Sequence, residues 1–169
     1  TLDRYFNPVT DNALTDELAE ALLRVVLEYG PAAVRDAHDE KAMSEIMWAG
    51  SLSHNGLTGL GGRKDFATHQ LGHALSEKFD VYHGDSLTAV WARSVMDEDP
   101  ARFARFARNV WHVEEADNTA AALAGIAKQE AFFQSIGMPV RLGELSCGVQ
   151  DEAGLADLAS RCSFGKTRT

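Results

Sequence analysis

Apolar side chains recur every three or four positions along most of the chain, the spacing that places them on one face of an α-helix. In the first long segment, Thr10, Asp11 and Thr15 are candidate helix caps. Gly30 and Pro31 are predicted to end this helix, with a short helix after them. The apolar face of the segment is predicted to contain Leu14, Leu18, Ala21, Leu22, Val25, Val26 and Tyr29.

The same period returns in six later segments, and capping or breaking residues separate them. Asp39 (or Glu40) and Asp65 are candidate caps, and Pro100 suits a first helical turn. No segment has a sustained alternation of period two, so no sheet is expected. The fold class predicted is all-α, a multi-helix bundle forming a single domain over residues 1–169. The predicted helices cover roughly residues 40–52, 67–79, 84–96, 100–110, 116–137 and 151–161.

The two ends of the chain predict that it is an internal piece of a longer protein. The opening TLDRYF has the pattern of a last helical turn, which Asn7-Pro8 then stops. The closing FGKTRT is a basic loop with no element after it. We therefore expect sequence beyond both ends.

Composition narrows the classes of partner. The chain has 169 residues, 45% of them hydrophobic, and a net charge of −9 with a pI of about 5.0. An acidic surface repels phosphate backbones and anionic lipids, so neither nucleic acid nor a membrane surface is an expected partner. No apolar run approaches the roughly 20 residues of a membrane span. Cys147 and Cys162 are expected to remain reduced in a cytoplasmic protein.

Three of the six histidines lie within the stretch 67–84. His69 and His73 are four residues apart and share a helix face, while His83 follows just past the predicted helix end. Imidazoles at this spacing are typical ligands of a divalent metal, although HxxxH alone is a weak signal and surface histidines match it by chance. The zinc-protease motif is not met, because Gln70 and Phe79 stand where it needs a glutamate and a third histidine.

The tryptophans, the cysteines and the remaining histidines give weaker evidence of a functional site. Trp48, Trp91 and Trp111 fall on helical faces with apolar neighbours and are expected in the core. Neither cysteine has a histidine nearby in sequence that would activate it. The remaining histidines are expected at the surface or at helix caps; they are His38, His54 and His112.

The chain resembles the iron-containing (group III) alcohol dehydrogenases, in the branch of NADPH-dependent butanol dehydrogenases and broad-range aldehyde reductases. The resemblance covers essentially the whole chain, with the segments in the family's order and spacing. It rests on RYFNPVTDNALTDELAEALLRVVLEYGPAAV, MWAGSLSHNGLTGLG, DFATHQLGHALSEKFDVYHGDSLTAVW, ARFARNVWHVEE and FFQSIGMPVRLGEL.

This resemblance implies an all-helical C-terminal domain that follows a dinucleotide-binding α/β domain absent from this chain. It implies a divalent metal, Fe²⁺ or Zn²⁺, held by one aspartate and three histidines, with His69 and His83 as the last two ligands. His73 matches a histidine beside the metal, a candidate to orient substrate or pass a proton. The other two ligands would precede Thr1. The resemblance also implies NADPH as cofactor, a small aldehyde or alcohol as substrate, and a homodimer.

Two alternatives use the same residues differently. The chain could be a self-contained helical module whose three histidines bind a metal or a partner without residues from elsewhere. It could also be a purely structural helical domain in which the histidines bind nothing.

Departures from the family pattern at Asp3, Asp85 and Ala92 bear on details of the pocket.

Overall fold

The computed structural model describes residues 1–6, 12–61, 66–91 and 99–162. These residues form α-helices and short 3₁₀ turns, and no strand occurs among them. The predicted all-α class is confirmed. The chain divides into two compact units, one made of residues 1–65 and 93–136, the other of residues 66–92 and 137–169.

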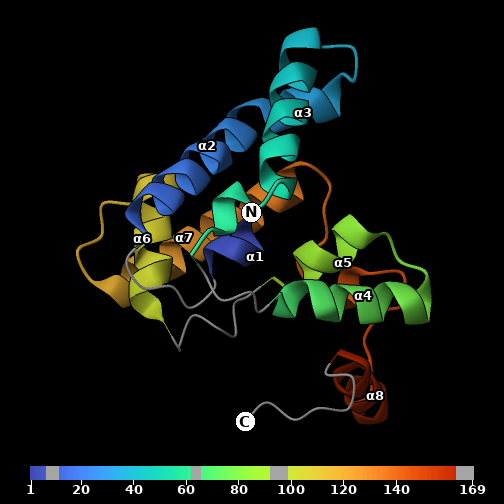
Figure 1. The fold of residues 1–169 in the computed structure, drawn as a ribbon. Helices are drawn as coiled ribbons and strands as arrows, with labels where there is room; N and C mark the ends of the chain where they lie inside the picture. Colours follow the sequence, from blue (N-terminus) through green and yellow to red (C-terminus); the bar gives the residue numbers. More distant parts are fainter. Residues whose placement is uncertain (7–11, 62–65, 92–98, 163–169) are drawn as a thin grey trace. The chain divides into compact units, whose positions relative to one another are not determined.

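The described residues of the first unit form five helices and one 3₁₀ turn (Figure 1). Its longest elements pack in pairs, α2 on α3 and α6 on α7. The elements are α1 (Leu2–Tyr5), α2 (Ala13–Arg35), α3 (Glu40–His54), η1 (Leu57–Gly59), α6 (Pro100–Trp111) and α7 (Asn118–Ser135).

Two of the predicted helix starts, at Asp39 and Pro100, are confirmed. Asp39 accepts a hydrogen bond from the Ala42 N–H at the start of α3. Asp117 caps α7 through the Ala120 N–H, and Pro100 occupies the first turn of α6. Thr10 and Asp11, proposed as caps of α2, lie outside the described residues, as does Asp65.

Helix α2 continues through Pro31 to Arg35, so the predicted stop at Gly30-Pro31 is wrong. Pro31 removes one intrahelical hydrogen bond and costs about 3 kcal/mol in a helix interior. Packing of the helix just before Pro31 offsets this cost. Gly30 is buried so near α7 that a Cβ there would lie 3.5 Å from Cζ of Phe132.

The buried face of α2 includes Leu22, as predicted, but the first half of the helix does not bury the predicted apolar positions. Leu14 is 74% exposed and Leu18 is 38% exposed, whereas Asp16 and Glu20 are buried. The prediction fails because the two carboxylates find cationic partners on α6, far along the chain. Trp48 is a second correction, since it is 63% exposed on α3.

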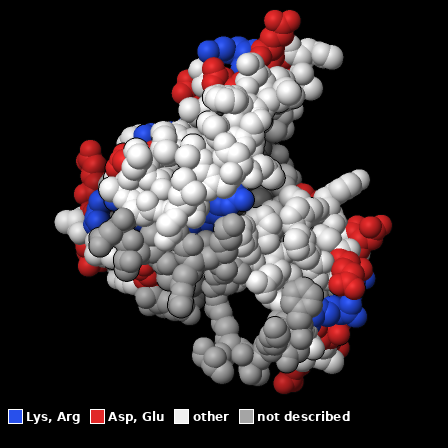
Figure 2. All heavy atoms as spheres, viewed as in Figure 1, with Lys and Arg blue, Asp and Glu red and all other residues white. Residues whose placement is uncertain are grey.

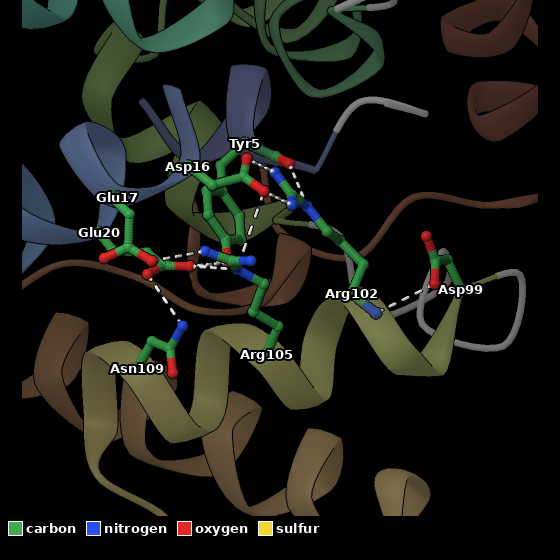
Figure 3. A network of polar contacts seen from close by, with 8 residues as sticks. All are labelled: Tyr5, Asp16, Glu17, Glu20, Asp99, Arg102, Arg105 and Asn109. Carbon is green, nitrogen blue, oxygen red and sulfur yellow. Dashed lines mark hydrogen bonds and ion pairs between the residues drawn. The ribbon is translucent and has the colours of Figure 1, made fainter. Parts of the chain in front are cut away.

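Glu20 is the centre of a buried polar network that joins α1, α2 and α6 (Figure 3). Its Oε1 accepts from Tyr5 Oη at 2.7 Å and from Arg105 Nε at 2.6 Å, and its Oε2 accepts from Asn109 Nδ2 at 2.9 Å. Desolvation, followed by the hydrogen bond to Glu20, raises the pKa of Tyr5 well above its ordinary value. The phenol therefore stays protonated as a donor.

Asp16 forms the second half of the network with Arg102. The guanidinium donates from both terminal nitrogens to the two carboxylate oxygens, at 2.6 Å each, and from Nε to the carbonyl of Tyr5 at 2.8 Å. It also lies over the Tyr5 ring, 3.9 Å from the ring centroid. The bidentate pair fixes the orientation of the guanidinium between α6 and α2, and the Nε hydrogen bond to Tyr5 then holds α1 against it.

Helices α6 and α7 approach each other closely through small residues. Gly125 on α7 is buried, and a Cβ there would lie 2.5 Å from Cβ of Ala107 and 3.0 Å from its Cα. We expect Gly125→Ala to lower the free energy of unfolding by about 1–3 kcal/mol, because the helices must separate. Gly50→Ala is the control. It has open space around the new methyl, so it is expected to stabilise by roughly 0.5–1 kcal/mol. Urea unfolding measures both changes in the free energy of unfolding. A loss of stability in both variants, or a gain in both, would contradict the expected close packing at Gly125.

The second unit packs its helices around Leu75 and Leu158, which are almost fully buried. Val81 and Leu145 belong to the same cluster. Helix α8 lies against α4 through this core, and the ion pair between Lys78 Nζ and Asp157 Oδ2 at 2.7 Å adds to the contact. The elements are α4 (Ala67–Phe79), α5 (His83–Ala89), η3 (Leu142–Glu144) and α8 (Glu152–Cys162).

Figure 2 shows acidic and basic side chains together at the tip where α2 and α3 join, and other small groups elsewhere on this face. Among the described residues on the face drawn, no broad basic surface occurs. None of the described helices combines the length and the apolar character needed to cross a membrane.

Candidate metal centre

Helix α4 carries the first two histidines of the predicted site. The residues at both of its ends, Phe66 and Asp80, adopt left-handed backbone angles, which turn the chain sharply into and out of the helix. Asp80 closes the helix by donating its N–H to the carbonyl of Ser76 at 3.0 Å. His69 and His73 lie one turn apart between these ends, so they share the face that the HxxxH spacing predicts.

His83 is the first residue of α5, and only three residues separate it from the end of α4. The predicted start of this helix near Gly84 agrees within one residue. The predicted end near Met96 does not agree, because α5 ends at Ala89, and residues 92–96 lie outside the described residues. The short link between α4 and α5 returns His83 to the helix that carries the other two histidines.

The three imidazole rings lie close together, as the sequence predicts. The ring centroids of His73 and His83 are 4.8 Å apart, with the ring planes 23° from parallel. The centroid distances are 5.6 Å for His69 and His83 and 6.2 Å for His69 and His73. His69 is half-buried, whereas His73 and His83 are exposed, so the cluster lies at the surface of its unit.

An aromatic neighbour that the sequence analysis did not single out contacts the cluster. The Phe66 ring meets the His69 ring edge to face, with centroids 5.4 Å apart and planes at 89°. The signal for this contact is the three-residue spacing, which places side chains on one side of a helical turn. Phe66 therefore limits the directions in which His69 can point.

The donor set fits a divalent metal in part. Neutral imidazole nitrogens suit both Zn²⁺ and Fe²⁺, and two imidazoles that bind one ion at about 2.1 Å have ring centroids about 5 Å apart, close to the His69–His83 distance. However, the described residues contain no group of three or more His, Cys, Asp or Glu side chains arranged to hold a metal ion. The cluster therefore offers part of a ligand shell.

The pKa of His83 lies below its ordinary value of 6.5, first because of partial desolvation and then because His73 and His69 repel added charge. We expect His83 to titrate below this value by NMR with a chelator present, and His73→Ala to raise its pKa. The unfolded chain binds this proton more readily. The contribution of His83 to stability is therefore complete above about pH 6.5 and is lost as the pH falls below that value. Titration of His83 above pH 6.5 would contradict this expectation.

Other predicted residues have simpler roles. His54 ends α3, where its Nδ1 lies 3.0 Å from the carbonyl oxygen of Gly50, and His112 caps α6 with a left-handed backbone. Asp85 lies in the first turn of α5, near the cluster in sequence. Ala92, the other departure from the family pattern near the site, lies outside the described residues.

The fold and the cluster together define a class, an all-helical domain that presents three neighbouring histidines at the junction of two short helices. The sequence model of the Fe-containing alcohol dehydrogenase family, C-terminal part, matches residues 2–169. The chain belongs to this family, and the resemblance seen in the sequence is confirmed.

Relatives of known sequence agree. The chain is 34% identical over 173 residues to a probable NADH-dependent butanol dehydrogenase 1 of Bacillus subtilis (strain 168), covering 99% of this chain and 45% of the relative. It is 30% identical over 148 residues to the NADPH-dependent aldehyde reductase YqhD of Escherichia coli (strain K12), covering 85% and 38%. The chain thus spans less than half the length of these relatives.

Solved structures support the same fold. The substrate- and cofactor-free form of the aldehyde reductase YqhD from E. coli superposes with a TM-score of 0.86 at 28% identity, covering 97% of this chain and 43% of that one. The NADH-dependent butanol dehydrogenase A from Thermotoga maritima has a TM-score of 0.86 at 24% identity, covering 96% and 41%. The second likeness concerns the fold alone.

Proposed function

We propose that this chain is the helical, metal-binding part of a dehydrogenase that transfers hydride between NAD(P)H and a small aldehyde or primary alcohol. The observation that carries the proposal is the cluster of His69, His73 and His83, with ring centroids 4.8–6.2 Å apart, in a chain that belongs to this family. Relatives named as butanol dehydrogenases and as an aldehyde reductase support the substrate class.

Each histidine has a distinct proposed role. His69 and His83 hold the metal, and the remaining ligands, an aspartate and a histidine, come from the protein outside this chain. When bound, the metal supplies a Lewis acid for the carbonyl oxygen and the nicotinamide supplies the hydride. His73 orients the substrate and donates a proton to its oxygen, as imidazoles do near neutral pH.

Finer features of the proposal rest on the family branch. The metal is Fe²⁺ or Zn²⁺, since imidazole and carboxylate ligands suit both. NADPH is the cofactor proposed, although relatives include proteins named for NADH and for NADPH. We further propose a cytoplasmic homodimer that binds neither nucleic acid nor membranes. Residues 1–169 would act in it as one helical domain, inactive without the nucleotide-binding part.

A Zn²⁺ titration of the 169-residue chain tests the proposal, with His83→Ala as the control. A complete four-ligand structural site reaches about 10–16 kcal/mol, whereas a partial site is expected to bind on the order of micromolar or more weakly. Weak binding that His83→Ala removes would support a partial site completed elsewhere. Binding that is indifferent to His83→Ala would overturn the proposal.

The second candidate function is a self-contained module that binds a metal or a partner through His69, His73 and His83. The close approach of all three rings favours it. The lack of a complete metal-holding group among the described residues favours the partial site instead. Tight one-to-one Zn²⁺ binding by the chain alone would favour the module.

A further inference from the structure

Helices α4 and α5, side by side in Figure 1, touch at a glycine. Gly72 is buried, and a Cβ there would lie 2.9 Å from Cδ2 of Leu87 and 3.0 Å from Oγ of Ser86. Ordinary contacts between carbon atoms are about 3.5–4.0 Å. Any side chain at position 72 would therefore displace the end of the Leu87 side chain and press on the hydroxyl of the buried Ser86.

Ser86 secures the other side of this contact. It is fully buried, with 0% of its surface exposed. Its hydroxyl donates to the carbonyl oxygen of His83 at 2.8 Å and lies 3.4 Å from the hydroxyl of Ser76 on α4. One small side chain thus contacts both the backbone that carries His83 and the helix that carries the other two histidines.

The contact and the histidines occupy the same helical faces. On α4, Gly72 lies one turn after His69, which places these two positions on one side of the helix, and it directly precedes His73 in sequence. On α5, His83 and Ser86 are three residues apart and so lie on one side as well. The separation of the imidazoles is therefore set within one turn of the Gly72–Ser86 contact.

We propose that Gly72 and Ser86 are positioning residues for the metal ligands, and that their close contact holds His83 against His69 and His73. This inference rests on the proposed function for its consequence, metal affinity. Metal sites tolerate deviations of about 0.2 Å in ligand distance, so a displacement of Ser86 and the start of α5 by a few tenths of an ångström would be enough to weaken metal binding.

Gly72→Ala in the 169-residue chain tests the inference with two readouts. In the metal-free chain, the nuclear Overhauser effect between the ring protons of His73 and His83 is expected in the wild type and lost in the variant. Zn²⁺ affinity is expected to fall about 10–100-fold, the range for groups that orient a metal ligand. Gly50→Ala, a helical glycine with open space around it, is expected to change neither readout.

The same substitution made in a Leu87→Ala variant separates a positioning role from general destabilisation. In Leu87→Ala the closest atom is gone, so adding Gly72→Ala is expected to cost less Zn²⁺ affinity than it does in the wild type. If Gly72→Ala loses helix by circular dichroism, Ser86→Ala replaces it. That variant removes the hydrogen bond to His83 and is expected to weaken both the ring contact and Zn²⁺ binding.

The two readouts distinguish failure of this inference from failure of the proposed function. An unchanged Overhauser effect in folded Gly72→Ala would overturn the positioning role, whatever the chain binds. Unchanged Zn²⁺ affinity beside a lower melting temperature would overturn it as well, because the glycine would then serve stability alone. A wild-type chain whose ring contact depends on Gly72 but which binds no Zn²⁺ would support the positioning of the imidazoles and overturn the metal function.

Discussion

His69→Ala and His83→Ala are each expected to abolish Zn²⁺ binding by the chain, whereas His73→Ala is expected to leave it nearly unchanged. Loss of a ligand should cost more than the roughly 10–100-fold that follows from losing a group that merely orients one. The rings of His69 and His83 have centroids 5.6 Å apart and come from different helices, so neither can replace the other. Competition with a chromophoric chelator measures the three affinities.

The same variants in the complete enzyme separate binding from proton transfer. His69→Ala and His83→Ala are expected to remove both the metal and the activity. His73→Ala is expected to keep the metal and to lower turnover by about 10²–10⁴-fold, the usual contribution of a general acid. The rings of His73 and His83 lie nearly parallel with centroids 4.8 Å apart, so the two variants change adjacent side chains and yet are expected to differ in metal content. Loss of the metal in His73→Ala would show that the proposed division of roles is wrong.

Glu20→Ala is expected to lower the free energy of unfolding by about 3–5 kcal/mol, the largest change expected for a substitution outside the histidine cluster. The substitution removes the acceptor for three donors at once, those of Tyr5, Arg105 and Asn109. The buried Tyr5 hydroxyl then loses its partner without regaining water, whereas Arg105 keeps its contact with Glu17. Urea unfolding, followed by circular dichroism, measures the change.

Glu17→Ala is the matched control for this prediction. Glu17 lies one turn away on α2 and also accepts from Arg105, at 3.1 Å, but its side chain is 65% exposed. Exposed ion pairs contribute about 0.2–1 kcal/mol, so the control is expected to lose little stability. Equal losses in Glu17→Ala and Glu20→Ala would mean that the network in Figure 3 stabilises the fold no more than surface charges do.

Features that depend on neighbours in sequence could be predicted, and features that depend on distant partners could not. The helix starts at Asp39 and Pro100 follow from local capping chemistry. The approach of His69 and His73 follows from helical spacing, and that of His83 from a short link. All of these signals lie within about one or two helical turns.

The buried face of α2 was predicted wrongly in its first half. The helical period of the segment could be read from the sequence, but which side of the helix is buried depends on Arg102 and Arg105. These arginines lie more than eighty residues away from the carboxylates that they pair with. By hydrophobicity alone, Leu14 belongs inside and Glu20 outside, and the structure reverses both. At the candidate site, the Gly72–Ser86 contact was likewise invisible, because glycine and serine carry no hydrophobic signal.

The two polar centres also differ in how they can assemble as the chain folds. Ser76 and Ser86, which meet where α4 and α5 pack, are 10 residues apart, whereas Arg105 and Glu20 are 85 residues apart. Closing the longer loop costs about 2 kcal/mol more in chain entropy. The contacts between α4 and α5 are therefore local. They can bring the three imidazoles together before the long-range charge network has closed.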